Sequence, residues 1–186
     1  GDLVAVPGRH TTAFLTLRLL SGGDFPIVEM PFHRIVGAVA EGQAIAGLLI
    51  HEAQLDPEAL GLRVVLELGP AWTSRTGSPL PLGLNVIRRD LDEIHGEGTC
   101  ERIASLLRSS VRHAIDQGEK TRAFLLARSD ERPEWKDRAL LDRYLAMYVN
   151  EQTVDLGDEG IGALRLLYRE GARAGLFAEP DEIDAV

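Results

Sequence analysis

Over the first half of the chain, short apolar runs alternate with segments that have the spacing of an amphipathic helix. The apolar runs predict strands and the segments between them predict helices, which is the βαβ order of an α/β lobe. Residues 3–6 and 46–50 are the most apolar runs, so we expect them to be neighbouring central strands of a parallel sheet. Further strands are expected at residues 25–32, 63–68 and 82–88, and helices at residues 13–20, 34–41 and 71–75.

After residue 89 the pattern becomes helical. Apolar side chains at Ile103, Leu107 and Val111 fall on one face of a predicted helix. Helices are expected at residues 101–117, 119–127, 134–149 and 158–174. Several amphipathic helices that follow one α/β lobe need a further surface to cover. We therefore expect an α/β lobe at residues 1–88 and a mainly helical segment at residues 89–186.

The composition places limits on partners and compartment. The chain has 186 residues, of which 45% are hydrophobic and 26% charged, as is usual for soluble globular proteins. A net charge of −9 and a pI of about 5.0 argue against nucleic acid as a partner, because phosphate binding requires clustered Lys and Arg. The lone Cys100 fits a reducing cytosol. No run reaches the ~18 apolar residues of a membrane span, so we expect a cytoplasmic protein.

The first candidate site is the turn that follows residues 3–6. Pro7 and Gly8 end the predicted strand, and Thr11 and Thr12 open the next helix. Backbone N–H groups and the positive end of the helix dipole gather at such a helix start, which favours a carboxylate or phosphate ligand. The spacing of a P-loop is absent. The alternative is that these threonines only cap the helix.

The second candidate site is His51, which follows the apolar run 46–50 together with Glu52. Ligands of open α/β sheets bind at the carboxyl ends of the strands, and a histidine there can act as a general base near neutral pH. A zinc motif of the HExxH type is excluded because Leu55 stands where the second histidine would be. The alternative is that His51 is a structural histidine and Glu52 a solvated charge.

Other reactive or aromatic side chains show no pattern that predicts chemistry. Trp72 could line a pocket for an aromatic ligand, although a packing role is the simpler interpretation. Cys100 has no histidine at a diagnostic spacing, and His33, His95 and His113 lack the spacing of metal ligands. We therefore expect no metal site.

Several sequence blocks together resemble the 1,4-dihydroxy-6-naphthoate synthase family of the futalosine route to menaquinone. They occur in the same order and spacing as in that family and extend over nearly the whole chain. The blocks are VAVPGRHTTA at residues 4–13, GLLIHE at 47–52, TGSPLPLG at 76–83, RRDL at 88–91 and YVNEQTVDLGDEG at 148–160.

The resemblance implies a type II periplasmic-binding-protein-like α/β fold, in which two lobes flank a cleft. Residues 1–88 would be the complete second lobe, and residues 89–186 would be a mainly helical part that belongs to the first lobe. Proteins of this family have a further upstream part with the strands of the first lobe, and we expect it to be missing here. Whether it is truncated, mis-started or separately encoded does not follow from the sequence.

The resemblance also implies an activity. The chain would be a carbon–carbon lyase that converts cyclic dehypoxanthine futalosine, a small carboxylate, to 1,4-dihydroxy-6-naphthoate. His51 would be the catalytic base, and Thr12, with Thr11 beside it, would contact the substrate at the helix start. Formation of the aromatic ring would drive the reaction, so no cofactor is expected.

Three alternatives remain open. The chain could be similar to the sister enzyme chorismate dehydratase, which has the same fold. It could be a solute-binding module that captures a small carboxylate without chemistry, in which case it would have no need of a base at His51. It could also be half of a split enzyme that requires a partner chain carrying the first lobe, or a homo-oligomer.

Overall fold

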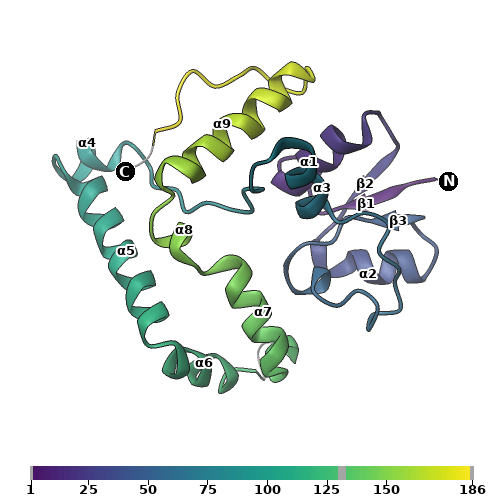
Figure 1. Cartoon of the computed structure of the whole chain (residues 1–186), viewed down its shortest axis with the longest axis horizontal. Coiled ribbons are helices and arrows are strands. Elements are labelled where there is room, and N and C mark those ends of the chain that lie inside the picture. The colour runs from purple at the N-terminus through teal and green to yellow at the C-terminus, as the bar shows by residue number, and fades with distance from the viewer. Residues whose placement is uncertain (1, 130–132, 185–186) are drawn as a thin grey trace. The chain divides into compact units, whose positions relative to one another are not determined.

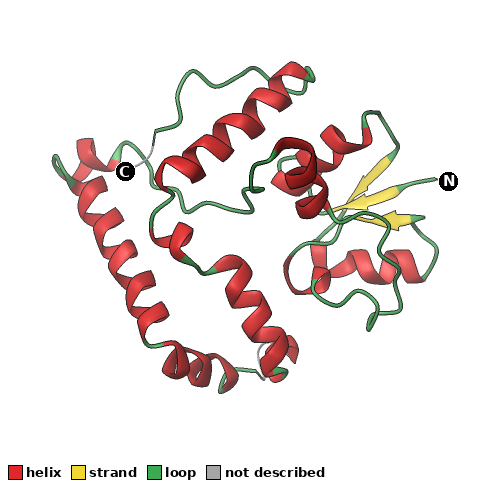
Figure 2. Ribbon diagram, in the orientation of Figure 1, coloured by secondary structure: helices red, strands yellow, loops and turns green. Residues whose placement is uncertain are grey.

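The computed structural model of the chain describes residues 2–129 and 133–184, which form two compact units. The first unit extends to Leu82 and also includes Ala163–Pro180, and the second consists mainly of Gly83–Gly162. The described strands all belong to the first unit, whereas the regular structure of the second is helical (Figures 1 and 2).

The first unit contains a three-stranded parallel sheet of order β2-β1-β3. Its strands are β1 (Val4–Val6), β2 (Ile27–Glu29) and β3 (Ala46–Gly47). In the register, Ala5 lies between Val28 of β2 and Gly47 of β3. Because all strands run the same way, the segments that follow them leave the sheet at one common edge.

Helices cover both faces of this sheet. Val6 and Leu48 pack against Phe14 of α1 (Thr12–Ser21), whereas Ala5 packs against Ile35 of α2 (Phe32–Ala40) on the opposite face. Alternation along β1 explains this division, because successive side chains of a strand point to opposite faces. Figure 1 shows α1 and α2 on opposite sides of the strands. The first unit is therefore an α/β lobe with helix, sheet and helix layers.

Gly47 allows α2 to approach β3 closely. A Cβ atom at this position would lie 2.5 Å from Cγ2 of Ile35 and 3.0 Å from Cγ2 of Val39. Contacts of that length do not occur between real side chains, so only glycine fits without a shift of the helix.

A third hydrophobic cluster joins α1 to later parts of the chain. Leu19 of α1 packs with Trp72 of α3 (Leu68–Thr76) and with Leu167 of α9 (Gly157–Arg173). The Arg75 guanidinium donates a 2.6 Å hydrogen bond to the carbonyl of Leu19 near the end of α1. The C-terminal part of α9 therefore packs on the α/β lobe.

Several predicted strands are shorter than expected or absent. Residues 25–32 form a strand only at β2, because Pro26 and Pro31 flank it and a proline has no N–H for the ladder. The predicted strands at residues 63–68 and 82–88 are wrong, since these residues are irregular up to Leu68, where α3 begins, and between residues 82 and 88. Their β-type side chains, such as Val65 and Val86, remain exposed, with no neighbouring strand among the described residues.

The prediction of two neighbouring central strands is correct for β1 and wrong for β3. β1 and β3 do pair directly, and β1 is central, but β3 is an edge strand. Ladder pairing of β3 ends after Gly47, and at His51 the chain enters a short 3₁₀ helix, η1 (His51–Gln54). Since residues 63–68 form no strand, none of the described residues pairs with the outer side of β3.

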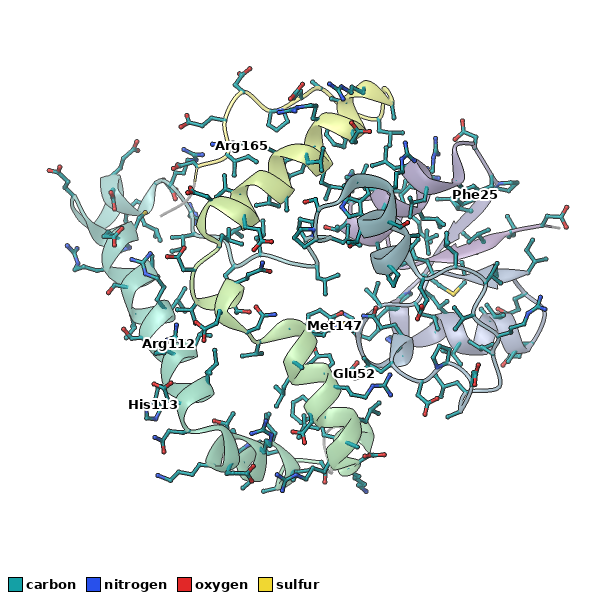
Figure 3. The ribbon with its side chains drawn as sticks, in the orientation of Figure 1. Phe25, Glu52, Arg112, His113, Met147 and Arg165 are labelled. Atoms are coloured by element: carbon teal, nitrogen blue, oxygen red, sulfur yellow. The ribbon has the colours of Figure 1, made fainter. Side chains whose placement is uncertain are left out.

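The second unit is a set of helices with few buried apolar side chains. Arg112 of α5, labelled in Figure 3, donates hydrogen bonds of 2.7 and 2.6 Å to the carboxylate of Glu151 in α8. Ala104 and Leu141 are the buried hydrophobic residues among those described in this unit, whereas Leu106 is 70% exposed. The unit contains α4 (Leu91–His95), α5 (Thr99–Asp116), α6 (Gly118–Leu126), η2 (Pro133–Lys136), α7 (Arg138–Tyr148) and α8 (Glu151–Val154).

The α/β class of the prediction is confirmed, with a small parallel sheet and a mainly helical remainder. The helices α4 and α8 were not predicted, because each spans barely one turn and shows no periodicity. The assignment of residues 1–88 and 89–186 to two lobes of a larger fold stays a prediction. No helix among the described residues is long and apolar enough to cross a membrane.

Candidate functional site

The candidate site lies at the carboxyl edge of the parallel sheet. Thr11 and Thr12 follow β1, Phe32 follows β2, and His51 follows β3. Because the three strands are parallel neighbours, these segments emerge at one edge, the usual location of ligand sites in open α/β sheets. His51 and the Thr11–Thr12 helix start therefore lie at a common sheet edge. We expect their side chains to face one shared cavity, which stays a prediction.

Thr11 is the N-cap of α1. Its hydroxyl accepts a 3.1 Å hydrogen bond from the backbone N–H of Phe14 and donates one of 2.9 Å to the carbonyl of Gly8. Gly8 has a φ of +153°, which L side chains rarely adopt, so a glycine is favoured in this turn. The Thr11 hydroxyl is thus occupied in building the helix start.

Thr12 is the first residue of α1 and is half-buried. Its carbonyl accepts a 2.8 Å hydrogen bond from the buried Thr16 hydroxyl. Within the described residues the Thr12 hydroxyl forms no hydrogen bond. Together with the first N–H groups of the helix, this hydroxyl can accept a ligand such as a carboxylate.

Glu29 at the end of β2 braces the turn after β1. Its carboxylate accepts a 3.0 Å hydrogen bond from the backbone N–H of Arg9 and one of 2.8 Å from Nε of the same residue. The backbone N–H of Arg9, then its side chain and, more weakly, His10 lower the pKa of Glu29 below its usual 4.5. The turn that presents the helix start is therefore tied to the neighbouring strand.

His51 has an unusual backbone conformation. Its φ of 56° makes it the one non-glycine residue with positive φ in the described parts of the chain. Residues held in this left-handed region cluster at ligand-binding and active sites, where the surrounding structure holds them in place. The ring of His51 lies against Phe32, with 4.5 Å between ring centroids and 45° between ring planes. Glu52, labelled in Figure 3, is the next residue of η1.

The remaining candidates behave as packing or surface residues. Trp72 is 1% exposed and belongs to the cluster with Leu19 and Leu167, which confirms the packing interpretation. Desolvation and the neighbouring Asp92 raise the pKa of the Cys100 thiol, which disfavours a reactive thiolate. Within the described residues, no group of His, Cys, Asp and Glu side chains has an arrangement that could hold a metal ion.

Two residues of this edge were not predicted from the sequence. Glu29 fell inside a strand predicted to run from residue 25 to 32, although an acidic residue near the carboxyl end of a parallel strand is a usable signal. Phe32 was assigned to the same strand, whereas it is the first residue of α2. Pro31 immediately before it is a signal for the end of a strand and the start of a helix.

Two curated relatives match this chain over nearly its whole length. The chain is 40% identical over 181 residues to a 1,4-dihydroxy-6-naphthoate synthase of Streptomyces coelicolor, which covers 95% of the chain and 61% of that protein. It is 39% identical over 178 residues to the enzyme of the same name from Thermus thermophilus, covering 96% of the chain and 62% of that protein. The chain thus spans about three fifths of the length of these curated relatives.

A solved structure and a family model agree with these relatives. The crystal structure of protein AF1704 from Archaeoglobus fulgidus superposes with a TM-score of 0.83 at 39% identity, covering 95% of this chain and 64% of that one. The family model described as menaquinone biosynthesis matches residues 1–173. The chain therefore belongs to the menaquinone biosynthesis family.

Proposed function

We propose that the chain carries the catalytic base and the substrate-binding helix start of a lyase that converts cyclic dehypoxanthine futalosine to 1,4-dihydroxy-6-naphthoate. The observation that carries this proposal is the placement of His51. His51 lies at the sheet edge where α1 also begins. Its backbone is held at a φ of 56°. The names of the two curated relatives support the same reaction.

His51 would act as a general base. The His51 imidazole would take a carbon-bound proton from the substrate. Cleavage of a carbon–carbon bond of the ring would then release the aromatic product, and the proton would pass to the leaving fragment. The new aromatic ring supplies driving force, so the proposed reaction requires no redox or metal cofactor. Glu52 is the other titratable side chain next to this position and is the alternative base.

The helix start of α1 would orient the substrate. A carboxylate would accept hydrogen bonds from the Thr12 hydroxyl and from the first N–H groups of the helix, and the helix dipole would favour its charge. Thr11 would contribute by shaping this helix start, since its own hydroxyl already bonds to Phe14 and Gly8. Fixing the substrate in this way would hold its reacting carbon beside His51.

We place this site in a type II periplasmic-binding-protein-like fold with two lobes. Residues 1–88 would be the second lobe, and residues 89–186 would be mainly helices that cover a sheet of the first lobe, apart from the C-terminal part of α9, which packs on the second lobe. The thin core of the second unit supports this arrangement, because Leu106 and Phe124 are 70% and 55% exposed while only Ala104 and Leu141 are buried hydrophobics among its described residues. The additional length of the relatives supports it too. Closure of two lobes would exclude water from the reaction.

The proposed setting is the cytoplasm, with a small carboxylate as substrate and no nucleic acid or membrane as partner. The first lobe would come from a segment joined to this chain, from a separate chain or from a second copy. In each case the base and the helix start would be supplied by this chain.

The test is an assay of substrate specificity. The chain is expressed alone and as a chimera with the part of the Streptomyces coelicolor relative that it does not match. The expected result is release of 1,4-dihydroxy-6-naphthoate from cyclic dehypoxanthine futalosine and no turnover of chorismate. Turnover of chorismate would identify the sister enzyme, and tight binding without turnover in the chimera would identify a binding module; either result contradicts the proposal.

A further inference from the structure

Phe32 and His51 contact each other across the carboxyl edge of the sheet. Phe32 is the first residue of α2, directly after β2, and His51 is the first residue of η1, after β3. In the strand order β2-β1-β3, these are the two outer strands, one on each side of β1. Their ring centroids are nevertheless 4.5 Å apart, a distance typical of interacting aromatic rings.

The geometry of this contact restricts the imidazole. The two ring planes are tilted by 45°, and the Phe32 ring lies directly beside the imidazole. The backbone of His51 is in the left-handed region, where side chains other than glycine are rare and surrounding contacts must hold the residue. Phe32 supplies such a contact from a different segment of the chain.

Phe32 is itself held on a second side. The ring of His33 meets it edge to face, with centroids 5.8 Å apart and planes at 83°. Even so, Phe32 is 37% exposed, which is unusual for a phenylalanine whose role is only to fill a core. The ring is therefore oriented by its neighbours and still borders the solvent at the candidate site.

We infer that Phe32 is a positioning residue that fixes the orientation of the His51 imidazole. Its catalytic consequence rests on the proposed role of His51 as base, whereas the orientation itself does not. A base must be held within a narrow range of angles to take a proton efficiently, so a neighbouring rigid ring is a suitable support. A leucine at position 32 would fill similar volume without a ring face, and a tyrosine would keep the ring.

The orientation is tested by chemical labelling of the chain with diethyl pyrocarbonate, which reacts with accessible imidazole nitrogens. Rates are measured for each histidine by peptide mass spectrometry in the wild type, Phe32→Leu and Phe32→Tyr. His95 and His113 lie in the second unit and serve as internal controls. We expect the His51 rate to rise about two- to tenfold in Phe32→Leu, the range that corresponds to one aromatic pair. It should return to the wild-type rate in Phe32→Tyr.

Two results would overturn the inference. One is a His51 rate that does not change in Phe32→Leu. The other is a rise that is no larger than the rise at His95 and His113, since this would report general unfolding and no specific support.

A kinetic measurement separates this inference from the proposed function. In the active protein, Phe32→Leu should lower kcat with little change in KM, and Phe32→Tyr should restore it. If labelling of His51 responds to Phe32 but His51→Asn retains normal turnover, the proposed function fails and the positioning role stands. If His51→Asn is inactive but the labelling rate of His51 is unchanged in Phe32→Leu, the positioning role fails and the proposed function stands.

Discussion

The carboxylate of Glu29 receives both the backbone N–H and the side-chain Nε of Arg9, at 3.0 and 2.8 Å. This pair ties the turn after β1 to the end of β2. This turn also supports the cap of α1, because the Thr11 hydroxyl donates a hydrogen bond to the carbonyl of Gly8. The helix start proposed to bind a carboxylate is thus held by a contact from β2 and by one within the turn after β1.

Stability should depend on pH through Glu29. Its pKa is lowered in the folded chain, so its ionised form stabilises the fold above the ordinary value of 4.5, and this contribution is lost as the pH falls through the lower folded value. Glu29→Gln should therefore lower the free energy of unfolding near neutral pH and have a smaller effect in acid. Urea denaturation at several pH values measures this difference.

The matched control is Glu58→Gln, which removes the same charge from an exposed loop position. A difference between wild type and Glu29→Gln that stays constant from neutral pH to well below 4.5 would argue against the Arg9 brace.

Gly47→Ala should destabilise the α/β lobe. The added methyl group would lie 2.5 Å from Cγ2 of Ile35, so α2 must move away from β3. Overpacking of this kind costs about 1–3 kcal/mol of unfolding free energy. Gly23→Ala is the control, because its Cβ would meet nothing within 4 Å. Equal stability of the two variants in chemical denaturation would show that the close contact of α2 with β3 is wrong.

The cap and the proposed ligand contact are assigned to different threonines. Thr11→Ala should lower the unfolding free energy by about 1 kcal/mol, the usual value of a lost N-cap, and Thr11→Ser should restore it. Thr12→Val should instead weaken substrate binding, because it removes a hydroxyl that has no hydrogen bond among the described residues. Denaturation curves and KM values measure the two effects, and a stability loss at Thr12 larger than at Thr11 would reverse the assignment.

The elements that the sequence predicted best have strong local signals. α1 follows a Pro-Gly turn and a threonine cap, and α5 and α9 have long apolar stripes. Strands at residues 63–68 and 82–88 were wrong because β-propensity has no effect without a partner strand. A single sequence shows which residues prefer an extended backbone, but it does not show what lies beside them.

The sequence predicted where the candidate residues lie in the sheet, but not which side chains contact one another. His51 stands directly after one apolar run, and the Thr11–Thr12 pair follows another after a short turn, so their position at the sheet edge followed from parallel topology. The contact of Phe32 with His51 joins segments that follow the two outer strands, and no periodicity or motif reports such a contact. The sequence also did not show whether Thr11 or Thr12 caps α1, because helix boundaries predicted from sequence are uncertain by at least one residue.

The most direct test of the central claim is turnover of cyclic dehypoxanthine futalosine by His51→Asn, measured in the chimera that supplies the unmatched part of the Streptomyces coelicolor relative. Asparagine tolerates the left-handed backbone at position 51 but cannot take the proton. We predict that kcat falls by roughly two to four orders of magnitude, the usual contribution of a positioned base, while KM changes far less. Near-normal turnover in His51→Asn, with loss of activity in Glu52→Gln, would contradict the account and make Glu52 the base.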